Sequence, residues 1–463
     1  MPYVANTDEN RRQMLERIGV GSFEELLKDI PEELRLKKPL NLPSALSELE
    51  VTNLMRELSE QNKSSLEYVN FLGAGSYDHF IPAVVDQIIS RSEFYTAYTP
   101  YQAEASQGTL QSIYEFQSLI CQLTEMELAN ASLYDGGSAL GEACLLAHYH
   151  TEKNRILIPE NLHPLYKRVL KTYVSGQGLK LVEVAHIDGQ IRASAVKEKI
   201  DDQTAAVVIQ NPNFFGVLEE DIEEIEKLTH SSGALLVMVC DPISLGILKT
   251  PGEYNADIVV GEGQSLGNRM SFGGPYLGYF ACKREYLRRL PGRLIGVTTD
   301  NRGQRGFVMT LQTREQHIRR EKATSNICTN QGLMALAATV YLSLLGKQGI
   351  KKVAELCLQK AHCTLEKIES ETGFKRKFSA PFFTEFVLES PVAPKKVIKA
   401  GLKQNLLAGV DLSQFKMGLD GCLLVAVTEK RSKAEIDGLV SFFKTQSQPV
   451  SKVKSESKGE VTV

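Results

Sequence analysis

Short, β-rich apolar runs that alternate with helical segments constrain the fold more than any other feature of this sequence. Five such runs occupy the middle of the chain: RILI at 155, LKLVEV at 179, AAVVIQNP at 205, ALLVMVCDP at 234 and ADIVVGEG at 256. They are nearly continuously apolar, which is typical of parallel strands buried on both faces of a sheet. The pattern therefore predicts an α/β domain with a mainly parallel sheet.

Helical patterns lie between and around these strands. Residues 218–230 carry acidic residues early and end near Gly233, as expected for a crossover helix. The apolar stretch 333–345 falls short of the ~20 residues that span a bilayer, so it predicts a core helix. A further helix over 109–126 would place these apolar side chains on one face: Leu110, Ile113, Phe116, Ile120 and Leu123.

Both ends of the chain differ from this middle part. Two capping boxes, Ser22 with Glu25 and Ser47 with Glu50, predict N-terminal helices. Near the C-terminus, two apolar runs predict strands and one Ser/Glu pair predicts the start of a terminal helix: FFTEFVLE at 382, CLLVAVTE at 422, and Ser432 with Glu435.

Four segments follow from these patterns. They are an N-terminal helical arm over 1–69, a large α/β domain over 70–330, a small C-terminal α/β domain over 331–446 and a disordered tail over 447–463. This layout is typical of fold-type-I pyridoxal-phosphate enzymes. Because doubly wound sheets support many chemistries, the layout alone does not identify an activity.

Charge and cysteine content exclude several classes of protein. A formal net charge of -3 supplies no basic field for nucleic acid or an anionic membrane. The eight cysteines form no CxxC pair, which indicates reduced thiols and argues against a structural metal. The first residues, MPYVANTDENRRQ, have neither the apolar core of a secretory signal nor transit-peptide character. We therefore expect a cytoplasmic protein whose partners are small molecules or proteins.

Two features of the central region fit a pyridoxal-phosphate cradle. Gly136, Gly137 and Ser138 lie at a turn that opens a helix, where free backbone N–H groups and the helix dipole favour a phosphate. An ordinary glycine turn explains them as well. Asp241 follows an apolar strand, a position from which a carboxylate can pair with the pyridine nitrogen, although Asp-Pro is also a common turn.

A third feature is the lack of a lysine where the cofactor would be attached. Gln264 stands one strand after Asp241, and an amide nitrogen cannot form a Schiff base. Lys249 and Lys283 lie nearby, and either is a candidate for an unrecognised Schiff-base lysine. Each is more simply a solvated surface charge.

Four blocks of sequence resemble the P proteins of the glycine cleavage system. They occur in the family's order and span most of the chain: FLGAGSY at 71, FYTAYTPYQAEASQG at 94, MELANAS at 126 and HIRREKATSNICT at 317. The second block is similar to the family's YTPYQPE-x-SQG, with Ala103 where the family usually has proline. This departure puts no catalytic residue in doubt.

The resemblance implies a function and an assembly. The family occurs as one long chain or as two subunits, and the length of this chain together with Gln264 resembles the separate first subunit. Such a subunit lacks the cofactor lysine and forms a two-plus-two heterotetramer with a second subunit that binds pyridoxal phosphate. The implied reaction is decarboxylation of glycine, with transfer of the aminomethyl group to the lipoyl arm of the H protein.

The resemblance also points to two groups of site residues. The first is a loop expected to present hydroxyls and an aromatic wall to the partner's cofactor, unless its rings pack in this chain's own core: Tyr95, Tyr98, Thr99, Tyr101 and Gln102. The second group is expected to contact a carboxylate or the H protein: Arg319, Arg320, Lys322 and Asn326. The alternative is that these residues form an ordinary solvated face. His79 and His317 lie in family-like blocks and are further candidates.

Other readings of the sequence lead to different functions. One is a self-sufficient pyridoxal-phosphate decarboxylase or aminotransferase that uses Lys249 or Lys283. Another is a subunit that acts only as a scaffold. A nucleotide-binding Rossmann protein is disfavoured, since no GxGxxG follows the first strand of the sheet.

Overall fold

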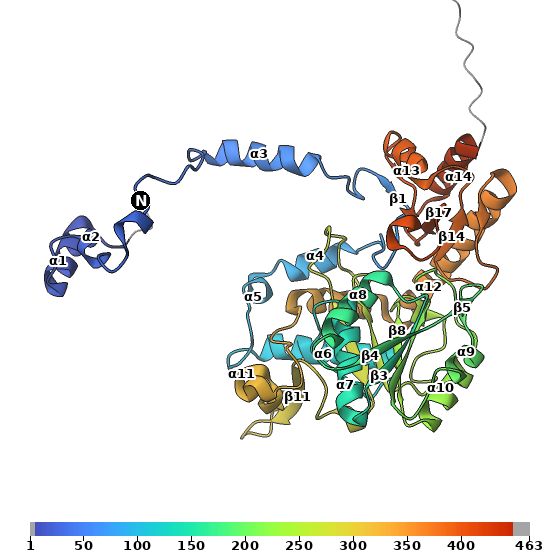
Figure 1. The fold of residues 1–463 in the computed structure, drawn as a ribbon, viewed down its shortest axis with the longest axis horizontal. Coiled ribbons are helices and arrows are strands. Elements are labelled where there is room, and N and C mark those ends of the chain that lie inside the picture. Colours follow the sequence, from blue (N-terminus) through green and yellow to red (C-terminus); the bar gives the residue numbers. More distant parts are fainter. Residues whose placement is uncertain (1–4, 448–463) are drawn as a thin grey trace, which may run out of the picture. The chain divides into compact units, whose positions relative to one another are not determined.

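The structure, a computed structural model, describes residues 5–447 (Figure 1). The chain separates into two compact units, and the division falls between Lys63 and Ser64. Strand β1 (Val69–Asn70), at the predicted end of the arm, pairs in parallel with β15 (Leu406–Leu407) inside the second unit. Most of the predicted tail, 448–463, lies outside the described residues, while Ser447 is the last residue of helix α14 (Lys433–Ser447).

The N-terminal unit consists of helices α1 (Asp8–Ile18), α2 (Phe23–Leu26) and α3 (Glu48–Glu60) with a short 3-10 turn. The capping box at the start of α3 is confirmed, because Glu50 N donates to Ser47 Oγ and Ser47 N donates to Glu50 Oε2. The predicted box at Ser22 is only half formed. Glu25 N donates to Ser22 Oγ, but the Glu25 carboxylate accepts its bond from Gly21 N instead.

A seven-stranded sheet forms the centre of the second unit, in the order β2-β10-β9-β8-β7-β3-β4. The five predicted strands are confirmed and are parallel to one another: β3 (Arg155–Pro159), β4 (Lys180–Val184), β7 (Thr204–Asn211), β8 (Leu235–Cys240) and β9 (Ile258–Glu262). Strand β10 (Gly278–Cys282) runs antiparallel to β9 and to β2 (Leu128–Ala129). The carboxyl ends of the parallel strands therefore meet at one edge.

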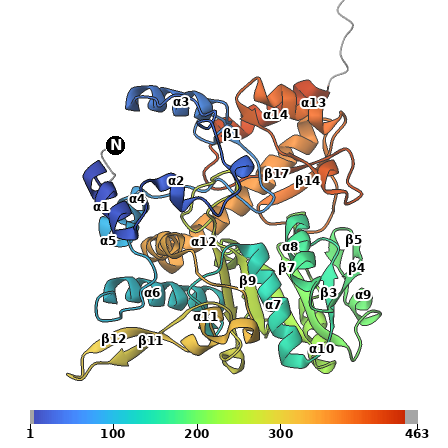
Figure 2. The ribbon, with the colours of Figure 1, turned by 60° about the vertical axis from the view of Figure 1, so that its left-hand side comes forward.

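Helices cover both faces of this sheet (Figures 1 and 2). Neighbouring residues along a strand face opposite cores: Leu236 packs in one and Val237 in the other. One core includes residues of α6 (Gln107–Thr124), α10 (Ile222–Ser231) and α12 (Gly332–Glu371), and the other those of α7 (Gly136–Thr151) and α8 (Pro164–Val174). The predicted buried face of α6 is confirmed, with Leu123 only partly buried.

Helix α10 begins four residues later than predicted. Leu218 N donates to Pro381 O, and the Glu219 carboxylate accepts bonds from the side-chain amides of Asn161 and Asn213. These tertiary contacts hold the segment before Ile222 in an extended path, so the acidic residues there do not join the helix.

A four-stranded antiparallel sheet forms the small domain. The two predicted strands are confirmed as β14 (Glu385–Glu389) and β17 (Cys422–Ala426), flanked by β13 (Lys375–Arg376) and β16 (Val410–Asp411). The predicted Ser432–Glu435 pair caps α14 with reciprocal bonds. The remaining described elements are α4 (Ala83–Ile89), α5 (Ser92–Tyr95), β5 (His186–Ile187), β6 (Gln190–Ile191), α9 (Ala193–Lys197), β11 (Leu294–Thr299), β12 (Arg305–Thr310), α11 (Gln316–Arg319), α13 (Pro394–Leu402) and several 3-10 turns.

Helix α12 joins the two domains. The predicted core helix is its first part, and the helix continues to Glu371 past Gly346, whose φ of 57° breaks the helical geometry. Ala338 and Leu342 pack against the large sheet, whereas Leu365 and Ile368 belong to the core of the small domain. By length and composition α12 is the one helix among residues 5–447 that would suffice to cross a membrane, but these contacts make it a core helix.

Candidate active site

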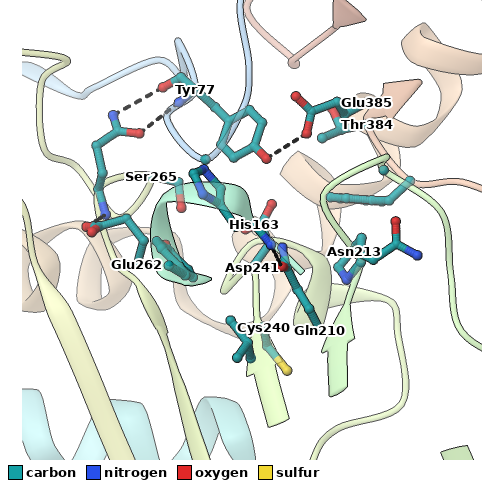
Figure 3. Close-up of a pocket in the computed structure, with 17 residues that line it drawn as sticks. Tyr77, His163, Gln210, Asn213, Cys240, Asp241, Glu262, Ser265, Thr384 and Glu385 are labelled. Carbon is teal, nitrogen blue, oxygen red and sulfur yellow. Dashed lines mark hydrogen bonds between the residues drawn. The ribbon is translucent and has the colours of Figure 1, made fainter. Parts of the chain in front are cut away.

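A cavity of about 40 Å³ lies at the carboxyl ends of β7, β8 and β9, where open α/β sheets bind their ligands (Figure 3). Side chains from six parts of the chain line it: Tyr77, His163, Gln210, Asp241, Glu262, Gln264, Ser265 and Glu385. The structure thus brings the predicted Asp241 and Gln264 together. The space holds a few water molecules and is far smaller than ordinary ligand pockets of about 300–1,000 Å³.

Gln264 is a structural residue of this cavity. Only 2% of the residue is exposed, and its side-chain polar atoms are fully engaged. Oε1 accepts a bond from Tyr77 N at 2.8 Å, while Nε2 donates to Tyr77 O at 3.1 Å and to Asn268 O at 2.8 Å. The amide therefore holds the 73–79 segment against the end of β9.

Glu262 is the last residue of β9, and its carboxyl group lies at the start of helix α7, next to the predicted glycine cradle. Its Oε2 accepts a bond from Gly136 N at 3.1 Å, and its Oε1 accepts bonds from Leu277 N at 2.9 Å and Gln264 N at 3.0 Å. Gly136 has no room for a side chain, because a Cβ would collide with the Tyr166 hydroxyl. Glu262 was not predicted from the sequence, where its only signal is its place at a strand end between two glycines.

Three acidic side chains line the cavity: Asp241, Glu262 and Glu385. Burial raises the pKa of Glu262 and of Glu385 to about 7, and burial also raises the pKa of Asp241. Burial lowers the pKa of His163 to about 4, so its ring is neutral at pH 7; Nε2 donates to Ala74 O at 2.8 Å.

Pyridoxal phosphate does not fit this cavity of the chain. No lysine or arginine stands among the described residues that line it, so no cationic side chain there would neutralise a phosphate. The two alternative lysines lie elsewhere, Lys249 in an ion pair at the surface and Lys283 in a partly buried ion pair. Lys249 Nζ is 2.6 Å from Glu223 Oε1, and Lys283 Nζ is 2.7 Å from Asp257 Oδ1.

The tyrosine-rich loop lies on the surface of the chain. Tyr95, Tyr98 and Tyr101 are 69%, 85% and 54% exposed, so their rings do not pack in this chain's core. Gln102 is exposed as well, Thr99 is half-buried, and Pro100 between them is buried. The loop therefore presents its aromatic rings outward from a fixed base.

Tyr101 connects this loop to the predicted basic block. Its ring meets the ring of His317 edge to face at 6.4 Å and lies 5.9 Å from the Arg293 guanidinium. Arg293, which the sequence analysis did not single out, is buried and donates to Cys328 O at 2.9 Å. The four predicted contact residues are exposed on the same block: Arg319, Arg320, Lys322 and Asn326.

His79 belongs to a different cluster, formed with Cys357 and Glu429. His79 Nδ1 lies 2.6 Å from Glu429 Oε2, and the Cys357 thiol donates to the same oxygen at 3.4 Å. Burial alone would lower the pKa of His79, but its bonds with Cys357 and Glu429 outweigh burial and raise that pKa well above its usual value. The three donor atoms lie within 4.8 Å, a spacing compatible with a metal that the sequence did not predict. The 2.6 Å contact between His79 Nδ1 and Glu429 Oε2 is that of a hydrogen-bonded ion pair.

Together, the sheet order, the two-domain layout and the cavity at the strand ends define a protein with the fold of type-I pyridoxal-phosphate enzymes, with Gln264 and no lysine among the described residues that line the cavity. Solved structures share this fold. One is a C-DES variant with glycine covalently linked to its pyridoxal-phosphate cofactor, with a TM-score of 0.61 at 12% identity over 81% of this chain and 96% of that one.

The family model "Glycine cleavage system P-protein" matches residues 1–443, and the chain belongs to this family. The probable glycine dehydrogenase (decarboxylating) subunit 1 of Carboxydothermus hydrogenoformans is 54% identical over 95% of this chain and 98% of its own. The crystal structure of an inhibitor-bound glycine decarboxylase (P-protein) of the glycine cleavage system has a TM-score of 0.87 at 41% identity, covering 96% of this chain and 100% of that one.

Proposed function

We propose that this chain is the cofactor-free subunit of a glycine-decarboxylating enzyme and completes the active site of a second, pyridoxal-phosphate-bearing subunit. The observation that carries the proposal is the acid-lined cavity, where Gln264 and no lysine stands among the described residues that line it. Relatives named subunit 1 support the existence of a partner. The assembly is a cytoplasmic heterotetramer of two copies of each subunit that serves the lipoylated H protein.

The tyrosine-rich loop is the part of this chain that reaches the partner's site. When bound in the partner, pyridoxal phosphate supplies the electron sink for decarboxylation of glycine. Tyr95, Tyr98 and Tyr101 cover that pocket and exclude water, and their hydroxyls donate hydrogen bonds to polar groups within it. Removing water favours decarboxylation because the carboxylate loses its hydration while the charge spreads in the transition state.

The basic block beside this loop contributes the attraction for an anion. Arg319, Arg320 and Lys322 are exposed, and no ion pair involves them within the described part of the chain. Arginine offers a two-pronged fork for a carboxylate, which suits either the carboxylate of glycine or an acidic surface of the carrier. The edge-to-face contact of Tyr101 and His317 holds the block next to the loop.

Replacing Tyr98 with phenylalanine tests the role of the loop. The Tyr98 hydroxyl is exposed in this chain, so its loss should leave folding and assembly intact. Glycine–bicarbonate exchange by the mixed complex should fall about tenfold, which corresponds to a lost hydrogen bond of about 1.4 kcal/mol. Tyr149→Phe is the matched control, since its hydroxyl donates to Gln177 on the surface. Unchanged exchange in the Tyr98 variant would favour the scaffold alternative.

A further inference from the structure

We propose that the carboxyl group of Glu262 occupies a phosphate position at the start of α7, so that removing its side chain opens a phosphate-binding site in this chain. The inference concerns the small cavity itself and does not depend on the proposed function. Gln264 accounts for the missing covalent attachment of a cofactor. Glu262 fills the space and takes the N–H donors that the phosphate of a cofactor would need.

The donors around the Glu262 carboxylate are those of an anion site. Three backbone N–H groups, of Gly136, Gln264 and Leu277, converge on its two oxygens from three different segments. Helix α7 is 16 residues long, so its N-terminus carries the partial positive charge that favours an anion. The capping residue Asp135 is engaged with Ser138 N at 2.7 Å and leaves these three donors to Glu262.

A second, independent observation points to a ligand at the same place. Ser265 is 4% exposed, its Oγ has no hydrogen-bond partner, and it lines the same cavity as Glu262 (Figure 3). A buried hydroxyl is ordinarily paired, since leaving one unpaired costs about 1–3 kcal/mol. The orphaned hydroxyl therefore adds an unpaired polar group to the cavity that Glu262 and Gln264 also line.

Charge and space both explain why the natural chain excludes phosphate. The three N–H groups already donate to the Glu262 carboxyl, and no lysine or arginine among the described residues that line the cavity would neutralise a phosphate. The free cavity measures about 40 Å³. Truncating Glu262 to alanine removes the carboxylate, leaves the three donors unpaired and enlarges the cavity at that point.

Thermal unfolding of Glu262→Ala in inorganic phosphate tests the proposal. The full chain is melted over a range of phosphate concentrations, with sodium chloride balancing the ionic strength. We expect the melting temperature of the variant to rise with phosphate, with an apparent affinity at least tenfold tighter than that of the wild type. The matched control is Glu385→Ala, which removes a second buried carboxyl of the cavity that lies away from the α7 N-terminus. It should respond like the wild type.

Each outcome of this experiment decides the question. A phosphate response confined to Glu262→Ala supports the proposal, and so does refolding of that variant only when phosphate is present. The proposal is overturned if Glu262→Ala does not respond to phosphate, either because the folded variant is not stabilised or because the variant stays unfolded at high phosphate. An equal response in Glu385→Ala or in the wild type also overturns it. The readout is phosphate binding and not turnover, so failure here leaves the glycine-cleavage proposal standing.

Discussion

Replacing Gln264 with leucine should destabilise the chain by about 3 kcal/mol. The side chain makes three hydrogen bonds with backbone groups, two to Tyr77 and one to Asn268, each worth roughly 1 kcal/mol net. Leucine has a similar volume, so little is added by a cavity. If Gln264 were instead a relic of a lost lysine without a structural role, its replacement would cost much less.

Urea unfolding of the purified chain measures this loss. The midpoint should fall while the denaturant dependence stays unchanged, because the surface exposed on unfolding is the same. Gln111→Leu is the matched control: its amide donates to Glu115 on the exposed side of α6, and its effect should stay within about 0.5 kcal/mol. A loss below about 1 kcal/mol for the Gln264 variant would refute a role in holding the 73–79 segment.

Four further substitutions test other parts of the structure. The pKa of Glu385 is raised by burial to about 7, so between pH 4.5 and 7 the folded state keeps a proton that the unfolded state has lost, and stability falls as the pH rises. The free energy of unfolding of Glu385→Gln and of the wild type is therefore measured at pH 5 and pH 8. Relative to the wild type, the variant should be about 2 kcal/mol more stable at pH 8 than it is at pH 5. The same difference between variant and wild type at both pH values would contradict the raised pKa. Lys249→Met and Lys283→Met should leave glycine–bicarbonate exchange of the mixed complex unchanged, because both amines sit in ion pairs away from the cavity; loss of exchange in either would revive the self-sufficient enzyme. Gly216→Ala should cost about 3 kcal/mol or more in urea unfolding, since φ is +80° and a Cβ would collide with Glu385 O; a small loss would mean that the segment adapts.

The sequence predicted the elements whose signal is local. The five parallel strands could be predicted because a strand buried on both faces must be apolar throughout. The capping boxes at Ser47 and Ser432 could be predicted because capping depends on residues three apart in the sequence. The start of α10 was misplaced because distant residues hold Leu218 and Glu219.

The site was predictable only in part, for a related reason. Gln264 could be singled out because its side-chain chemistry excludes a Schiff base. Glu262 and Arg293 could not, since their roles come from donors and acceptors that are far away in the sequence: Gly136 lies 126 residues from Glu262, and Cys328 lies 35 residues from Arg293. The exposure of the tyrosine loop likewise depends on how the chain packs as a whole.

Borohydride reduction of the co-purified two-subunit complex tests the central claim most directly. Reduction fixes pyridoxal phosphate to the lysine that holds it, and peptide mapping then locates the label. The label should appear on the second subunit alone, and glycine–bicarbonate exchange should require both chains. A reduced adduct on any lysine of this chain, or exchange by this chain alone, would contradict the claim.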